Sequence, residues 1–176
     1  MVDATHPFAA TITATAATVC AELGLPHLVL ARPAWEPAGV TLVGSDIEAA
    51  ELVARQGYSR IFLTTGRSGT AAFVGSDAWF LIRAVTPPDP VTLPAHQEVL
   101  LSRGPYDYAG EHALMRDHRI DALVTKNSGG AMTRPKLDAA SALGVAVVMI
   151  DRPALPAGVN TVPSVDAAEN WVRGFS

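Results

Sequence analysis

Residues 121–140 read DALVTKNSGGAMTRPKLDAA, which places a lysine, two small polar residues and two glycines directly after an apolar run. Glycines let a backbone turn sharply and approach a ligand closely. The helical pattern that follows would present unpaired N–H groups and a partial positive charge. The stretch therefore predicts a phosphate or carboxylate site formed by Lys126, Asn127, Ser128, Gly129 and Gly130. The same residue types also form ordinary strand-to-helix turns, so that interpretation stays open.

A second glycine-containing turn, TTGRSGT, follows the apolar run RIFL. It begins with Thr64, Thr65, Gly66 and Arg67. The turn is similar to phosphate-binding turns, although it matches neither the GxGxxG pattern nor the Walker A pattern. Arg67 could reach a 2′-phosphate, or its guanidinium could simply be solvated.

The segment ATHPFA places Thr5, His6 and Pro7 in a third polar loop. Proline fixes its own φ and biases His6 toward an extended conformation, so this loop is expected to be stiff. His6 could donate a proton to a ligand or hydrogen-bond it. It could equally satisfy backbone groups of its own loop, and the local sequence does not separate these roles.

A fourth loop, SRGPY, carries Arg103 and Gly104, and two further cations, Arg134 and Lys136, follow the TKNSGG stretch. Guanidinium and ammonium groups suit anionic ligands. The histidines and Cys20 do not have the spacing of a zinc site, so no metal is expected. No GxSxG or Ser-His-Asp pattern supports a hydrolase, and Cys20 lies among apolar residues as a core side chain would.

The rest of the chain alternates short apolar runs with helical patterns, which predicts an α/β fold with parallel strands covered on both faces. A proline-rich loop precedes the final helical pattern, at residues 164–175. In open parallel sheets, ligands bind beyond the carboxyl ends of the strands. All four polar loops follow predicted strands or, for ATHPFA, the strand-like N-terminus.

The stretch TPPDPVTLPAH contains four prolines and is the best candidate for a domain boundary. It divides the chain into predicted halves at 1–86 and 87–176. MVDATHPF reads as the end of a strand entering a functional loop, so the first half is expected to lack upstream strands.

Composition restricts the classes of partner. Of 176 residues, 49% are hydrophobic and 17% charged, and the net charge is -4, with a pI of about 5.7. An acidic chain of this kind argues against a general nucleic-acid binder. No apolar run is long enough for a membrane span, and no signal peptide is visible. The single cysteine fits a reducing cytoplasm. Neither a nucleic acid nor a membrane is expected as a partner, and the oligomeric state, a monomer or an assembly, stays open.

Several motifs occur together and in one order: DATHPFA at 3–9, ARPAW at 31–35, TTGR at 64–67, RGPY at 103–106 and TKNSGG at 125–130. In this combination the chain resembles the precorrin-6A reductases of cobalamin biosynthesis, the CobK/CbiJ family, over nearly its whole length. Family members begin with a further strand and a GGTxE-type turn that this sequence lacks, which leads us to expect a truncated first half.

The resemblance implies two Rossmann-like halves with cofactor and tetrapyrrole in the cleft between them, and hydride transfer from NADPH to the macrocycle of precorrin-6A. NADH is the alternative cofactor, and a non-catalytic remnant that binds a tetrapyrrole or nucleotide is the alternative function. The residues expected to bind the cofactor are Thr64, Thr65, Gly66, Arg67, Lys126, Asn127, Ser128 and Gly129. Those expected to bind substrate carboxylates are Thr5, His6, Pro7, Arg103, Gly104, Arg134 and Lys136. His6 is also the candidate proton donor, although water or the substrate's own acidic groups could serve instead.

Overall fold

The computed structural model describes residues 1–36 and 38–175, which form two compact units. The first unit consists of residues 1–35, residues 128–130 and the described residues from 152 onward. The second unit contains the described residues of 36–127 and 131–151. Each unit is therefore assembled from segments that lie far apart in the sequence. Among the described residues, no helix has the length and apolar character needed to cross a bilayer.

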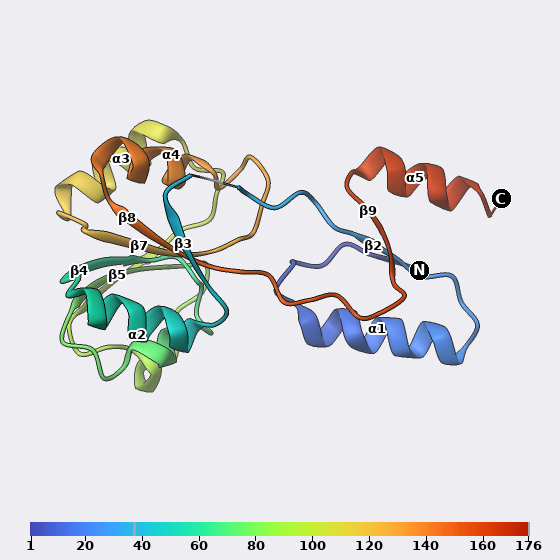
Figure 1. Cartoon of the computed structure of the whole chain (residues 1–176), viewed down its shortest axis with the longest axis horizontal. Helices are drawn as coiled ribbons and strands as arrows, with labels where there is room; N and C mark the ends of the chain where they lie inside the picture. The colour runs from blue at the N-terminus through green and yellow to red at the C-terminus, as the bar shows by residue number, and fades with distance from the viewer. Residues whose placement is uncertain (37, 176) are drawn as a thin grey trace. The chain divides into compact units, whose positions relative to one another are not determined.

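The second unit is built on six parallel strands in the order β3-β8-β7-β4-β5-β6. The strands are β3 (Val40–Val43), β4 (Arg60–Leu63), β5 (Trp79–Ala84), β6 (Gln97–Leu101), β7 (Ala122–Lys126) and β8 (Ala146–Ile150). Figure 1 shows α2 (Asp46–Gln56) on one face of this sheet, with α3 (Tyr108–Asp117) and α4 (Pro135–Leu143) on the other. The central strands are apolar on both faces because helices cover both.

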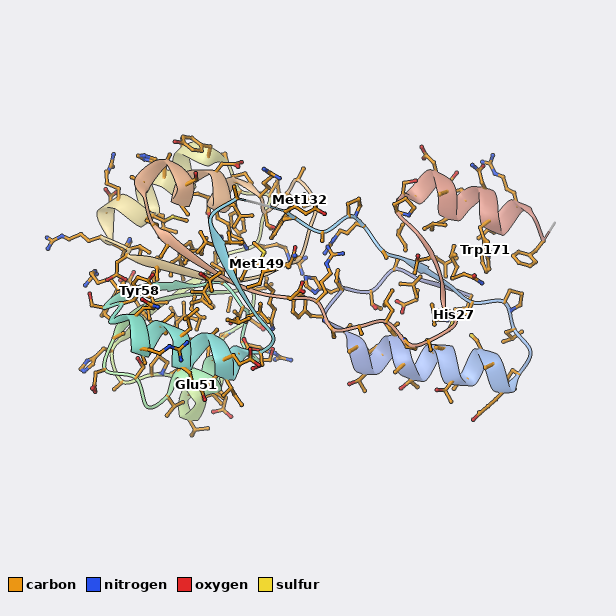
Figure 2. The ribbon with its side chains drawn as sticks, viewed as in Figure 1. His27, Glu51, Tyr58, Met132, Met149 and Trp171 are labelled. Carbon is orange, nitrogen blue, oxygen red and sulfur yellow. The ribbon has the colours of Figure 1, made fainter. Side chains whose placement is uncertain are left out.

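The core of this unit lies between the sheet and its helices. Phe62, Phe80, Met115 and Met149 are fully buried there, and Figure 2 shows Met149 in the interior of the unit. Burial of such side chains is the main source of stability, at roughly 1.5–3 kcal/mol for each one.

Local sequence signals define the ends of α2. The Ser45 hydroxyl accepts the N–H of Glu48 at 3.1 Å, and the Glu48 carboxylate accepts the N–H of Gly44 at 2.9 Å. The first bond is an N-cap bond, and the second satisfies the N–H of the residue that precedes the N-cap. The helix ends at Gly57, whose φ of 73° lies in the left-handed region that glycine adopts without strain.

The first unit holds three parallel strands in the order β1-β2-β9. They are β1 (Val2–Asp3), β2 (Leu28–Leu30) and β9 (Asn160–Val162), and Figure 1 shows α1 (Ala10–Glu22) and α5 (Val165–Arg173) on opposite faces. In Figure 2, Trp171 points from α5 toward the strands of its own unit. It helps to line an apolar pocket with Met1, Val2, Pro26, Val172 and Phe175. None of the predicted site residues lines this pocket.

A buried ion pair crosses the core of the second unit. Arg83 of β5 donates from Nη1 to Oε1 of Glu111 on α3, and from Nη2 to Oε2 at 3.0 Å. The two side chains are only 5% and 3% exposed. The Arg83 guanidinium also lies 3.7 Å from the ring centroid of Tyr106 and 4.8 Å from that of Phe62. The two charges are thus paired where water has little access to them, and the guanidinium is also stacked on aromatic rings.

The α/β fold with parallel sheets confirms the fold class expected from the sequence. The compact units, however, do not coincide with the predicted halves 1–86 and 87–176. β5 and β6 flank the proline-rich stretch and pair in register from Phe80↔Gln97 to Ala84↔Leu101. The prolines therefore sit in a crossover connection within one sheet. β9 was also missed, because its three residues lie inside what we expected to be a proline-rich loop.

We expect Arg83→Met to lower the free energy of unfolding by about 3–5 kcal/mol, because it leaves the Glu111 carboxylate buried without its partner. Chemical denaturation measures this loss. The double variant Arg83→Met/Glu111→Met should recover much of it, since no lone charge then remains. Arg116→Met is the matched control, because its partner pair with Asp117 is about 60% exposed and should contribute at most about 1 kcal/mol. Equal losses for Arg83→Met and Arg116→Met would contradict this account.

Candidate functional site

Two of the predicted polar loops leave the sheet of the second unit side by side. β4 and β7 are neighbours, with Ile61 opposite Ala122 and Leu63 opposite Val124. The backbone N–H of Thr64 continues this pairing by donating to the Val124 carbonyl at 2.9 Å. The turn after β4 and the segment after β7 therefore emerge together at the carboxyl edge of the sheet, where parallel sheets bind ligands.

The chain contains only two lysines, and both end on the turn after β4. Lys126 Nζ donates to the Thr65 carbonyl oxygen at 3.0 Å. Lys136, from the first turn of α4, lies with its Nζ 3.3 Å from Thr64 Oγ1. We call Thr64, Thr65, Lys126 and Lys136 the lysine–threonine cluster. Two ammonium groups at one turn favour an anionic ligand.

The Thr65 hydroxyl is buried and has no hydrogen-bond partner among the described residues. Buried hydroxyls of this kind usually bond to water or to a ligand. Space beside it is limited, since a Cβ on Gly69 would lie 2.2 Å from Thr65 Oγ1 and 2.4 Å from Asp46 Oδ1. Position 69 therefore requires glycine. Gly66 has a φ of 79°, which gives the turn a conformation that other residues rarely adopt.

Lys136 is the most perturbed cation of the site. The pKa of its ammonium is lowered from the ordinary 10.5 to about 7, mainly by burial and also by the nearby Arg83 guanidinium, while the Glu111 carboxylate opposes both effects. Glu111 forms the ion pair with Arg83 and also acts favourably on the Lys136 ammonium. The group of three carries an excess positive charge when Lys136 is protonated, and an anion nearby would stabilise that state.

The TKNSGG segment belongs to both units. Lys126 and Asn127 lie in the second unit, whereas Ser128, Gly129 and Gly130 lie in the first. Both glycines have positive φ, 67° and 80°, as the sequence predicted for a sharp turn. At Gly129 the close approach is to the protein itself, since a Cβ there would lie 2.2 Å from the Pro33 carbonyl oxygen.

The ATHPFA loop is fixed by its own hydrogen bonds. The Asp3 carboxylate accepts the N–H of Thr5 at 2.9 Å. Burial alone would raise the pKa of Asp3, but hydrogen bonds from Thr13 and Thr5 outweigh it and lower this pKa. The His6 Nδ1 accepts the N–H of Phe8 at 3.3 Å. His6 therefore satisfies a backbone group of its loop, which was one of its two predicted roles.

Ser128 gathers further side chains in the first unit. The His6 Nε2 lies 3.2 Å from its hydroxyl oxygen, and the Nε of Arg32 donates to its carbonyl at 2.7 Å. Arg152 donates to the carbonyls of Arg32 and Pro33, at 2.7 and 3.2 Å. We call His6, Arg32, Ser128 and Arg152 the Ser128 cluster. Arg32 and Arg152 were missed from the sequence because their partners here are main-chain carbonyls that have no sequence signature.

The other predicted residues are more dispersed. Arg67 and Arg103 are exposed, and Arg134 is exposed and paired with Asp138 on its own helix at 3.5 Å. Asn127 is buried, and its N–H donates to the Ile150 carbonyl at 2.9 Å. Gly104 lies against the ring of Tyr106, because a Cβ added to Gly104 would lie 3.2 Å from the nearest ring atom. Within residues 1–36 and 38–175, no cluster of histidine, cysteine and carboxylate side chains could hold a metal ion.

The predicted sets are thus divided by unit. Of the expected cofactor residues, Ser128 and Gly129 lie in the first unit and the others in the second. Of the expected substrate residues, Thr5, His6 and Pro7 lie in the first unit and the others in the second. Lys136, which was expected to bind substrate, contacts Thr64, which was expected to bind cofactor. The order of the strands in the sheet decides which predicted site residues lie together, and the linear sequence does not give that order.

The family model for precorrin-6x reductase CbiJ/CobK matches residues 1–173. The chain is 68% identical to the precorrin-6A reductase of Mycobacterium tuberculosis, over 99% of this chain and 72% of that protein. It is 55% identical to the precorrin-6A reductase of Rhodococcus erythropolis, over 98% of this chain and 70% of that protein. A solved structure of a CobK precorrin-6A reductase superimposes with a TM-score of 0.90 at 35% identity, over 98% of this chain and 72% of that chain.

We expect Gly129→Ala to destabilise the protein by roughly 2 kcal/mol or more, because the new Cβ would strike the Pro33 carbonyl and the Arg152 guanidinium in addition to the strain at positive φ. Gly158→Ala is the matched control. Its φ is 77°, but nothing lies within 4 Å of a Cβ there, so only the backbone strain of about 1 kcal/mol remains. Thermal and denaturant unfolding of both variants measure the difference, and similar losses would refute the steric argument.

We expect the stability of the protein to rise with pH through the range in which Lys136 is neutral when folded and charged when unfolded. The folded pKa of about 7 lies below the ordinary 10.5, so between these values the unfolded chain binds more protons and alkali favours the folded state. The slope is at most about 1.4 kcal/mol per pH unit. Lys136→Met should lose this rise, while Lys126→Met, which keeps Lys136, should retain it. Parallel stability curves for wild type and Lys136→Met would contradict the prediction.

Proposed function

The chain belongs to the precorrin-6x reductase CbiJ/CobK family, and from this we propose that it transfers a hydride from NADPH to the macrocycle of precorrin-6A. Together with one proton, the hydride reduces one double bond of the tetrapyrrole. The structural observation that best supports a cofactor site is the convergence of both lysines on the Thr64–Thr65 turn.

The lysine–threonine cluster has the chemistry to hold the cofactor phosphates. Lys126 and Lys136 supply positive charge, and the buried Thr65 hydroxyl has no partner among the described residues. Gly66, at positive φ, turns the backbone sharply beside them. When bound, the nicotinamide supplies the hydride, and the protein's part is binding, orientation and electrostatics.

Arg67 is the residue we propose to select NADPH over NADH. It follows the turn directly and is exposed, and its side chain makes no ion pair with any described residue. A guanidinium binds phosphate bidentately. Only NADPH carries a 2′-phosphate, so such a contact would discriminate between the two cofactors.

The substrate carboxylates are assigned to cations of the other loops. Arg103 is exposed beside Gly104. Arg134 is exposed at the start of α4, where it forms an ion pair with Asp138. In the first unit, Thr5 and His6 are exposed on the stiff loop before α1. We propose that His6 orients the macrocycle or relays the proton, and that Pro7 keeps this loop rigid so that little entropy is lost on binding.

We expect Arg67→Ala to raise the KM for NADPH by about ten- to hundredfold, as loss of a charge-assisted contact of about 1.5–3 kcal/mol implies. The KM for NADH and the KM for precorrin-6A should stay within about twofold of wild type, because neither depends on a 2′-phosphate contact. The measurement is a spectroscopic assay of precorrin-6A reduction with each nicotinamide. Arg55→Ala, another exposed arginine of the second unit, is the control and should leave all three constants unchanged.

The possible results test separately the role of Arg67, the catalytic activity and the choice of cofactor. An unchanged KM for NADPH in Arg67→Ala would remove Arg67 from the cofactor site. Binding of precorrin-6A and NADPH by the wild-type chain without any turnover would favour the non-catalytic alternative. Turnover with NADH but not with NADPH would overturn the choice of cofactor while leaving the reductase assignment intact.

A further inference from the structure

Arg32 is the least expected member of the Ser128 cluster, because its charge is exposed and yet its side chain is held in place. It lies just after β2, in the ARPAW motif. Its Nε donates to the Ser128 carbonyl at 2.7 Å. Its Cδ packs beside Gly130, since a Cβ added to that glycine would lie 3.6 Å from it. The aliphatic stem thus runs along the 128–130 segment while the charged end faces solvent.

The backbone beneath Arg32 is also fixed. The Arg152 guanidinium bonds the carbonyls of Arg32 and Pro33, and Gly129 approaches the same Pro33 carbonyl so closely that no Cβ would fit. An arginine on a mobile loop loses side-chain and backbone entropy when it binds a ligand. Arg32 has already lost much of this freedom in the folded protein, which lowers the entropic cost of a further contact.

The anchoring bond determines which edge of the guanidinium remains available. Arginine can grip a carboxylate through Nε and one Nη, or end-on through Nη1 and Nη2. Because Nε is engaged with Ser128, only the end-on fork remains. Throughout the described part of the chain, Arg32 makes no ion pair, and its only hydrogen bond from the side chain is the one to Ser128.

We propose that Arg32 is a substrate-binding residue, and that its end-on fork binds one carboxylate of the tetrapyrrole. This rests on the proposed function, which supplies a substrate rich in acetate and propionate groups. A phosphate could also bind such a fork. The substrate is favoured because Arg32 shares its anchor with His6, a residue of the expected substrate set: Ser128 contacts Arg32 through its carbonyl and His6 through its hydroxyl. Ser128 itself was expected to bind the cofactor, so the test below measures the affinity for NADPH as well. The cation cluster suited to cofactor phosphates lies in the second unit.

The test measures substrate and cofactor affinity separately. Arg32→Met keeps the aliphatic stem over Gly130 but removes the fork, and Arg32→Lys keeps the charge but not the fork. We expect Arg32→Met to weaken equilibrium binding of precorrin-6A, followed by absorbance without cofactor, by about ten- to hundredfold. Arg32→Lys should recover part of this affinity. The Kd for NADPH and the melting temperature should stay close to wild type.

Arg173→Met is the matched control, because Arg173 is an exposed arginine of the same unit whose ion pair, among the described residues, is with Glu169 on its own helix. It should change neither affinity. Unchanged precorrin-6A binding in Arg32→Met would overturn the proposal. So would a selective loss of NADPH binding, which would make Arg32 a phosphate ligand, or an equal loss of both affinities with a lowered melting temperature, which would make its role structural. If wild type binds precorrin-6A but does not reduce it, the proposed function fails while the binding comparison still decides the role of Arg32.

Discussion

The close approach of the Gly129 backbone to the Pro33 carbonyl and the Arg152 guanidinium is the constraint on which the first unit's polar site depends. A Cβ at Gly129 would overlap both groups, so only glycine permits this packing. With the turn held there, the two polar groups of Ser128 serve two partners. Its carbonyl anchors Arg32 and its hydroxyl meets His6. The glycine that the sequence suggested for approach to a ligand also permits the protein's own segments to meet.

The second unit depends on charge in a different way. An acidic chain places both of its lysines at one turn and buries a third cation, Arg83, nearby with a single carboxylate. Such an arrangement is unfavourable for the isolated protein, since burial depresses the pKa of Lys136 and a charged form must be desolvated. An anionic ligand bound nearby would raise the pKa of Lys136 and so favour its charged form. The cost of desolvating the charged form is what the proposed binding of an anion would offset, and residues that break local folding rules often lie at functional sites.

Sequence reasoning succeeded where the signal was local. The alternation of apolar runs and helical patterns predicted the parallel α/β fold, and the sharp turn expected at Gly129 and Gly130 is present, with positive φ at both. It failed where the cause lies far along the chain. Arg32 and Ser128 are 96 residues apart, and their bond involves a main-chain carbonyl, which any residue type could supply.

The predicted division at the proline-rich stretch differs from the compact units for a related reason. Prolines mark places where a helix or strand cannot continue, and both a linker and a crossover loop satisfy that condition. Only the pairing of β5 with β6 distinguishes them. The burial of Lys136 was equally hidden, because a lysine in the first turn of a helix normally extends into solvent. Its contact with Thr64 depends on α4 following β7, the neighbour of β4 in the sheet.

The hydrogen bonds of His6 bear on which of its roles the folded geometry favours. Nδ1 can accept the Phe8 N–H only while it carries no hydrogen. The ring hydrogen then resides on Nε2, which can donate it to the Ser128 hydroxyl oxygen. Adding a second proton to the ring would break the bond to Phe8 and loosen the loop that positions the histidine. An orienting role keeps both bonds, whereas a proton-relay role must break and remake one in each cycle. With both bonds kept, His6 fixes its own loop and the Ser128 hydroxyl oxygen, while its role toward a substrate stays a prediction.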